Sequence, residues 1–229
     1  MPPFERYALY YLCPPGPLAD FGASWLGWDV AKGVSVPHPE VAGLPRPVED
    51  ITATPRKYGF HGTIKPPFRL AEDRSFAALE AEATALCARL APVTLEGLAL
   101  TPLGHFLALT PAGDAADLAC LAAACVEGLD DFRRPAGEAE LARRRSRGLS
   151  PRQEANLTRW GYPYVMDDFR FHMTLSGRLS AEDLAATAAA LDPVVTPLLS
   201  APYEITEMAL VGADAEDRFH LVKRLPLKG

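Results

Sequence analysis

The sequence contains two stretches with one pattern, FHGTI at residues 60–64 and FHMTL at residues 171–175. Each places a histidine two positions before a threonine, and a hydrophobic residue follows the threonine. Residues i and i+2 of a β-strand share a face, so each stretch predicts a strand that carries an imidazole beside a hydroxyl. The residues between and after them are predicted to point into a core behind each strand.

The segments that follow the two stretches also match. The tripeptide LAL at 98–100 begins 37 residues after His61, and the similar tripeptide MAL at 208–210 begins 36 residues after His172. This spacing predicts an internal duplication with repeats at about 56–112 and 167–227. We therefore expect an α+β fold in which two antiparallel-sheet lobes surround a central cleft and the helices lie outside.

The remaining pattern predicts a single bilobal domain over residues 1–229 with an N-terminal strand and helix within 4–30 and a helical insertion at about 114–162. Pro66 and Pro67 are expected to interrupt the first motif strand. Ser150 and Ser180 are expected to cap helices. The predicted strands are 7–12, 60–70, 93–100, 105–110, 169–179, 203–211 and 218–225, of which 93–100 and 105–110 form a hairpin. The predicted helices are 18–28, 72–90, 115–129, 138–147, 151–160 and 181–199.

Composition limits the classes of function. The chain has 229 residues, 48% of them hydrophobic, and a net charge of −6, which argues against a non-specific nucleic-acid binder. Any phosphate site must therefore come from a local basic pocket. The four cysteines form no C-x-x-C pair and predict buried thiols in a reducing compartment. The first apolar run, 7–12, is too short for a membrane span, so we expect a cytoplasmic protein without signal peptide or membrane anchor.

The two motifs together indicate acid–base chemistry on phosphate. Cleavage of a phosphodiester needs a base for the attacking oxygen and an acid for the leaving oxygen, and His61 and His172 can fill these roles at neutral pH in either order. Thr63 and Thr174 are expected to bind the phosphoryl oxygens. Each motif offers one imidazole and one hydroxyl, whereas zinc sites recruit three or four ligands, so we expect neither metal nor cofactor.

Five further residues are candidates for substrate binding. Lys65 is predicted to share the strand face of His61, and Arg56 is a second basic candidate near the first motif. Tyr58 can stack on a ligand or pack in the fold. Arg133 and Arg143, in the insertion, can either capture a distal phosphate by folding over the cleft or form a solvated surface.

Two H-x-[ST]-hydrophobic motifs in the two halves of one chain resemble the two-histidine (2H) phosphoesterase superfamily. Residues 58–68, 160–164 and 169–175 resemble a bacterial branch of it that is linked to phosphonate metabolism. The resemblance implies a bilobal fold and metal-free chemistry on cyclic phosphates or 2′,5′-linked phosphodiesters.

In that setting the resemblance also implies a small phosphorylated substrate, 5-phosphoribosyl 1,2-cyclic phosphate, which would be opened to ribose 1,5-bisphosphate. The residues themselves do not select it over a nucleoside 2′,3′-cyclic phosphate. An RNA-end phosphodiesterase and a non-catalytic protein that binds a phosphorylated metabolite therefore remain alternatives.

Overall fold

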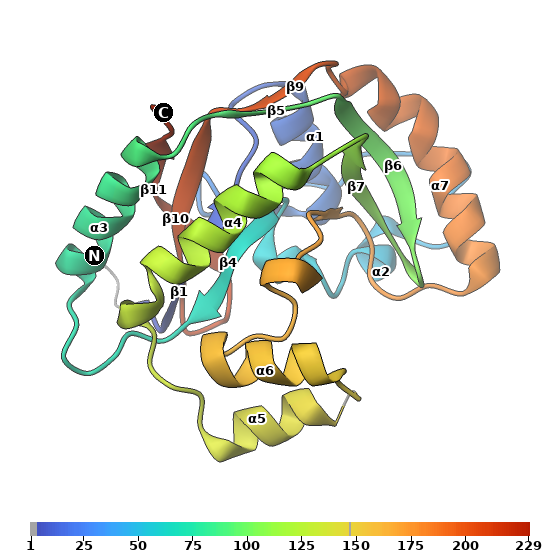
Figure 1. The fold of residues 1–229 in the computed structure, drawn as a ribbon. Coiled ribbons are helices and arrows are strands. Elements are labelled where there is room, and N and C mark those ends of the chain that lie inside the picture. Colours follow the sequence, from blue (N-terminus) through green and yellow to red (C-terminus); the bar gives the residue numbers. More distant parts are fainter. Residues whose placement is uncertain (1–3, 147) are drawn as a thin grey trace.

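The computed structural model describes residues 4–146 and 148–229, and its centre is a seven-stranded antiparallel sheet (Figure 1). The strand order is β11-β10-β1-β4-β8-β7-β6. The strands are β1 (Arg6–Tyr11), β4 (Gly62–Phe68), β6 (Gly97–Leu103), β7 (Phe106–Ala112), β8 (Met173–Thr174), β10 (Glu207–Ala213) and β11 (Phe219–Pro226).

Helices cover one face of this sheet. In Figure 1, α3 and α4 lie in front of the strands and α7 flanks the β6–β7 hairpin, while α5 and α6 lie together at the lower edge. The helices are α1 (Pro17–Leu26), α2 (Val48–Ile51), α3 (Phe76–Arg89), α4 (Ala116–Gly128), α5 (Glu138–Arg145), α6 (Pro151–Trp160) and α7 (Ala181–Val195). Two small antiparallel pairs complete the fold, β2 (Trp28–Asp29) with β3 (Val34–Ser35), and β5 (Val93–Leu95) with β9 (Tyr203–Ile205).

The topology has the symmetry of the duplication. Each half runs from a motif strand through a helix and a short strand to a hairpin, and β5 pairs with its counterpart β9. The β6–β7 hairpin of the first half pairs with β8 of the second, and the β10–β11 hairpin of the second half reaches β4 through β1. The predicted α+β class with antiparallel strands is confirmed, and both lobes share one continuous sheet.

The two halves of that sheet are joined at one residue pair, Gly62 opposite Met173. Met173 is fully buried in the main hydrophobic cluster, together with Ile64 and Leu175. A Cβ at Gly62 would lie 2.3 Å from the ring of Phe171, so the ring occupies the space where a side chain would stand. The junction therefore requires glycine on its core side.

Strand β4 does not end at its prolines, contrary to the sequence prediction. Between the pairs Tyr10–Thr63 and Leu9–Lys65 the register shifts, which leaves Ile64 as an extra residue and forms a bulge. Since β8 pairs with β4 only at Gly62, Pro66 and Pro67 face a stretch of strand with no partner on the β8 side. Prolines are tolerated at such edges.

The second motif strand is shorter than predicted. Strand β8 holds only Met173 and Thr174, and the chain beyond it is fixed by single backbone hydrogen bonds. The amides of Leu175 and Ser176 donate to the Leu107 carbonyl, and the amide of Leu179 donates to that of His105. The segment thus stays beside β7 without forming a ladder.

Several element boundaries also differ from the predictions. Helix α3 begins at Phe76 because Ser75 caps it, accepting a hydrogen bond from the Ala78 amide. The predicted strand 93–100 is split, since β5 pairs with β9 instead of joining the hairpin. The predicted caps Ser150 and Ser180 are confirmed.

Three cysteines are buried as predicted, but Cys120 is exposed. Residues 1–3 of the predicted domain and Arg147 of the predicted helix 138–147 lie outside the described residues. Within the part of the chain that the structure describes, no helix is both long enough and apolar enough to cross a membrane.

The junction gives a first prediction. A Gly62→Ala substitution should lower the free energy of unfolding by about 1–3 kcal/mol, because the new methyl group overpacks against Phe171. Chemical denaturation measures this. The matched control is Gly97→Ala in β6, where a Cβ meets its nearest atom at an ordinary 3.7 Å. Equal stability of the two variants would show that the junction tolerates a side chain.

Candidate active site

The four motif side chains lie on the sheet face that the large helices do not cover. Because Gly62 and Met173 face the core, the residues on either side of them point the opposite way. Counting one residue outward in this antiparallel pair sets His61 across from Thr174, and Thr63 across from His172. The sheet thus brings the two predicted histidines and the two predicted threonines together as neighbours.

His61 is held in a defined tautomer. Its Nδ1 lies 2.9 Å from the carbonyl oxygen of Gly59, which can only accept, so Nδ1 carries the proton. Its Nε2 is therefore an acceptor when the ring is neutral, and the Thr63 hydroxyl, 3.0 Å away, donates to it. The ring stacks on Tyr10 with centroids 3.8 Å apart. Gly59 has φ +67°, a conformation that favours glycine, and this turn aims the accepting carbonyl.

His172 repeats the arrangement. Its Nδ1 donates to the carbonyl of Arg170 at 2.8 Å, so its Nε2 also faces away from the backbone. Its ring lies 5.8 Å from the ring of Phe106. In both motifs the carbonyl two residues before the histidine accepts from Nδ1 and orients the imidazole. The Nε2 atom of each ring is therefore the nitrogen that points away from the backbone.

The environments of the two rings nevertheless differ. The pKa of His61 is lowered from 6.5 to about 4, mainly by burial and also by His172, while the hydrogen bond to Gly59 acts in the opposite direction. His61 is therefore neutral at pH 7. A neutral imidazole with an unprotonated Nε2 is suited to accept a proton.

A cleft of about 530 Å³ opens beside these residues, and we call it the histidine cleft. His61 and Thr174 line it together with the predicted Tyr58. Sequence reasoning did not select two other lining residues, Arg178 and Ser176, and it assigned His105 and Phe106 no binding role. Arg178 is exposed, and no side-chain partner is recorded for it among the described residues. The only sequence signal for Arg178 is its place four residues after Thr174.

His105 precedes Phe106 and His220 follows Phe219, the first residues of β7 and β11, and the two histidines have different surroundings. His105 lines the histidine cleft. His220 instead forms a 2.7 Å contact with Asp214 and packs near Trp28. Only the first therefore borders the motif residues.

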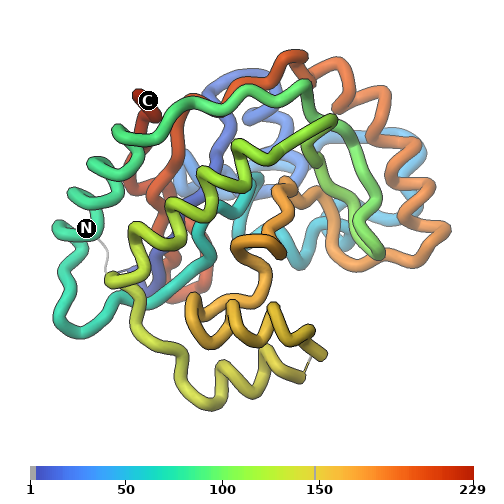
Figure 2. The backbone as a smooth tube through the Cα atoms, viewed as in Figure 1, coloured from blue at the N-terminus to red at the C-terminus, as the bar shows by residue number. Residues whose placement is uncertain are grey.

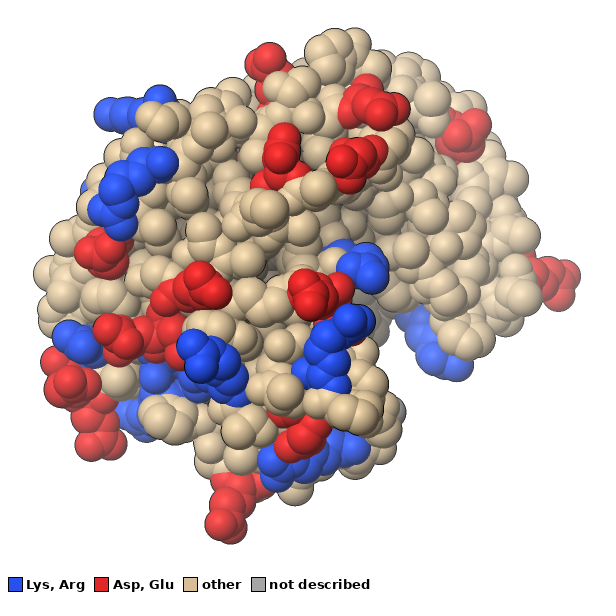
Figure 3. Space-filling view, in the orientation of Figure 1, with Lys and Arg blue, Asp and Glu red and all other residues tan. Residues whose placement is uncertain are grey.

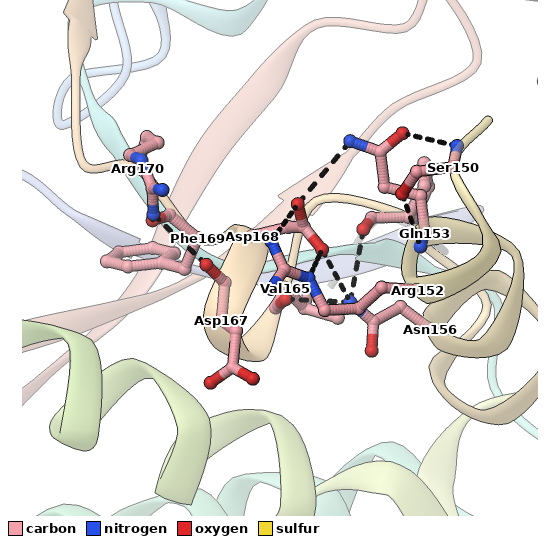
Figure 4. A network of polar contacts seen from close by, with 10 residues as sticks. Ser150, Arg152, Gln153, Asn156, Val165, Asp167, Asp168, Phe169 and Arg170 are labelled. Atoms are coloured by element: carbon pink, nitrogen blue, oxygen red, sulfur yellow. Dashed lines mark hydrogen bonds and ion pairs between the residues drawn. The ribbon is translucent and has the colours of Figure 1, made fainter. Parts of the chain in front are cut away.

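A polar network fixes the chain that leads into the second motif (Figure 4). Asp168 accepts from Arg152 at 2.7 Å, and Gln153 and Asn156 also donate to it. The hydrogen bond from Arg152 holds the pKa of Asp168 below its usual value. Helix α6 thereby anchors the segment whose next residues include Arg170, the partner of His172.

Lys65 does not point into the histidine cleft, and the prediction that it shares the face of His61 and Thr63 is wrong. The bulge at Ile64 turns its side chain to the helix face, where it is 2% exposed. Its ammonium group donates to the Val126 carbonyl at 2.8 Å, at the end of α4, and lies 3.5 Å from Asp130. Burial lowers the pKa of Lys65 to about 8.

The Arg56 side chain is hydrogen-bonded mainly to backbone carbonyls and does not line the histidine cleft. Its guanidinium donates to the carbonyls of Leu26 and Glu49 and to the Thr52 hydroxyl, which ties α1 to α2. Tyr58, in contrast, lies where the sequence suggested, with its ring 6.3 Å from that of His61. Of the three candidates around the first motif, only Tyr58 borders the cleft.

Arg133 and Arg143 line a different cavity from His61. Arg133 is bound to Asp130 at 2.8 Å, and Arg143 is exposed. A lid function for these arginines over the histidine cleft stays a prediction. Within residues 4–146 and 148–229, no three His, Cys, Asp or Glu side chains gather into a group able to hold a metal ion.

The environment of His61 gives a second prediction. The folded chain keeps His61 neutral down to about pH 4, whereas a histidine in the unfolded chain takes up a proton near pH 6.5. Acidification from pH 6.5 to 4 therefore favours unfolding. Between pH 6.5 and 5, wild type should lose about 2 kcal/mol more stability than His61→Gln, measured by denaturant titration.

The matched control for this measurement is His38→Gln. His38 also contacts a backbone carbonyl through Nδ1, that of Trp25, but it does not line the histidine cleft. This variant should keep the full pH dependence of wild type. A pH dependence that survives in His61→Gln would contradict the assignment.

Comparison with known proteins finds both sequence relatives and similar structures. Over 180 residues, 78% of the chain, it is 43% identical to the ribose 1,5-bisphosphate phosphokinase PhnN of Janthinobacterium sp. (strain Marseille). Over 182 residues it is 37% identical to the protein of that name from Laribacter hongkongensis (strain HLHK9). The matches span 40% and 42% of those relatives, so the chain corresponds to about two fifths of their length.

Similar solved structures include three that each cover 98% of the chain. A phosphoesterase has a TM-score of 0.44 at 15% identity over 99% of its own chain, and E. coli LigT complexed with 3′-AMP has 0.44 at 15% over 98%. TT0787 of Thermus thermophilus has a TM-score of 0.45 at 14% identity over 98%.

A family model described as a protein of unknown function, DUF1045, matches residues 63–220, which include Thr63 and the whole second motif. This match covers more than half of the chain. The chain belongs to the DUF1045 family.

Proposed function

We propose that this chain is a phosphodiesterase that opens a small cyclic phosphodiester with two histidines and without a bound metal. The observation that carries the proposal is the paired geometry of His61 and His172. Each donates Nδ1 to a carbonyl two residues back, which leaves Nε2 unprotonated in the neutral ring, and each motif lies directly across the Gly62–Met173 pair from the other. Two such imidazoles on one face supply a base and an acid to a single phosphoryl group.

The roles of the two histidines follow from their surroundings. His61, neutral at pH 7, takes a proton from the attacking water through Nε2. The water oxygen forms a bond to phosphorus, and the bond from phosphorus to the ring oxygen breaks. His172, in its protonated form, gives a proton to that leaving oxygen. The hydroxyls of Thr63 and Thr174 donate to the non-bridging oxygens, where negative charge develops.

The substrate we favour is 5-phosphoribosyl 1,2-cyclic phosphate. Hydrolysis of its ring at the 2-oxygen yields ribose 1,5-bisphosphate, and this is the compound named as the substrate of the longer PhnN relatives. Because the chain matches two fifths of those relatives and contains no G-x-x-x-x-G-K-[ST] loop, we assign the kinase reaction to their remaining part. Arg178 in the histidine cleft is a cation for the second phosphate.

One observation favours a second candidate substrate, a nucleoside 2′,3′-cyclic phosphate. Tyr58 and Phe106 both line the histidine cleft, and Leu103 and Pro55 extend its apolar wall. A planar base can stack on such aromatic rings, whereas a ribosyl bisphosphate gains little from them. The same two-histidine chemistry would open either ring.

The third prediction tests catalysis. In EDTA, wild type should hydrolyse at least one of 5-phosphoribosyl 1,2-cyclic phosphate, nucleoside 2′,3′-cyclic phosphates and a 2′,5′-linked dinucleotide. His61→Ala and His172→Ala should each lower kcat/KM at least about a hundredfold, the scale of a lost general acid or base. His220→Ala is the matched control and should keep its activity, since His220 pairs with Asp214 away from the cleft.

The panel also separates the alternatives. Preference for the ribosyl compound supports the first substrate, and preference for the nucleoside compounds supports the second. A folded wild type that binds these compounds without turning any of them over would be a metabolite-binding protein, and the proposal would be wrong.

The fourth prediction assigns the two roles. A p-nitrophenyl phosphodiester has a leaving group that needs no proton, so the loss caused by His172→Ala should shrink by at least about tenfold on this substrate. The loss caused by His61→Ala should stay undiminished, because the attacking water still needs a base. The reverse pattern of rescue would exchange the two roles.

A further inference from the structure

A cavity of about 600 Å³ lies between the ends of β1 and β4 and the start of the insertion. We call it the arginine pocket. In the described part of the chain, the basic residues that line it are Arg6, Arg69, Arg133, Arg134, Arg143 and Arg144. Three carboxylates, Glu5, Glu140 and Asp217, also line it, and two more, Asp130 and Glu72, pair with Arg133 and Arg134 from outside the lining. Six positive charges therefore stand against five negative ones, which leaves an excess of one positive charge.

That charge is unusual for this molecule. The chain as a whole carries −6, and in Figure 3 the Lys and Arg side chains gather in the lower part of the view, over α5 and α6, with acidic side chains among them. A concave surface with an excess of positive charge attracts anions. The arginine pocket is thus a local attractor for anions on a protein that otherwise repels them.

Two of the arginines are fixed in place before any ligand arrives. Arg133 donates from Nε and Nη2 to the Asp130 carboxylate and from Nη2 to the Arg159 carbonyl, and its side chain is only 15% exposed. Arg144 is held by Glu140 at 2.7 Å and lies over the ring of Tyr162. A guanidinium has five N–H donors. The hydrogen bonds of Arg133 and Arg144 to described residues use Nε and Nη2, so the two N–H groups on Nη1 of each remain for a ligand.

The backbone also approaches the fixed arginine closely. Gly161 has φ +73° and ends α6, and a Cβ there would lie 2.9 Å from Nη1 of Arg133. Glycine therefore leaves room for this guanidinium at the wall of the pocket. The other wall carries longer, exposed cations, of which Arg143 has no recorded side-chain partner among the described residues.

The arginine pocket is separate from the histidine cleft. Arg6 and Tyr10 are four residues apart on the same face of β1, which is about 13 Å along a strand. Tyr10 stacks on His61, whereas Arg6 lies over Phe219 at the rim of the arginine pocket. No residue lines both cavities, so the arginine pocket and the histidine cleft are distinct hollows in the described part of the chain.

We infer that the arginine pocket binds a compact, multiply charged phosphate group, of the pyrophosphate class. Arginine forks match phosphate oxygens in pairs, and six guanidinium groups lining one cavity suit a group that offers the oxygens of more than one phosphate. A single phosphate monoester carries fewer charges and reaches fewer of the forks. The inference does not rest on the proposed hydrolysis, because none of the motif residues lines this pocket.

The test, a fifth prediction, is titration calorimetry with inorganic pyrophosphate in about 0.15 M salt. Wild type should bind it with a Kd below about 1 mM and more tightly than inorganic phosphate. The double variant Arg69→Ala/Arg143→Ala should weaken binding at least about tenfold, since it removes two cations that line the pocket. Both residues are exposed, so the variant should keep its fold.

Two controls make the result specific. Arg46→Ala/Arg89→Ala removes the same charge from two exposed, ion-paired arginines outside the pocket and should change the affinity by less than about twofold. His61→Ala should also bind pyrophosphate normally. Absence of binding by wild type, full binding by the pocket variant, equal loss in the charge control or loss in His61→Ala would each overturn the inference.

Discussion

The pairing of Gly62 with Met173 is the constraint on which the site depends. Among the described residues it is the only pair recorded between β4 and β8, and it lies at the centre of both motifs. On one side it packs Met173 and the Phe171 ring into the core. On the other side it sets the four polar motif side chains on one face of the sheet. A shift by one residue would exchange the faces and bury the histidines instead.

The approximate twofold symmetry of the halves ends at β1. The second motif strand pairs directly with β7, but β1 stands between the first motif strand and the β10–β11 hairpin. Tyr10 of this additional strand stacks on His61 and contributes to its burial, and burial is the main cause of its lowered pKa. His172 has no such cover and faces Phe106 at 5.8 Å. An element outside the duplication therefore makes two equal motifs unequal, and we take this inequality to separate a base from an acid.

Periodicity and spacing predicted the duplication, the α+β class and the shared face of the motif residues, because these depend on local strand alternation. The position of Lys65 could not be predicted in the same way. Alternation places it with His61 and Thr63, but the bulge opposite Leu9 depends on pairing with a strand more than fifty residues away. The short length of β8 and the place of Arg178 in the cleft likewise depend on tertiary contacts with Leu107, His105 and Ile51.

The insertion connects the two anion-attracting regions of the molecule. It leaves the core at Asp130, whose carboxylate binds both Lys65 behind β4 and Arg133 in the arginine pocket. Helices α5 and α6 of the insertion follow one another at the edge of the fold, and the chain then returns toward β8, as Figure 2 traces. The return is anchored through Asp168, two residues before the Arg170 carbonyl that orients His172. One continuous segment therefore forms a wall of the pocket and leads into the strand that carries His172.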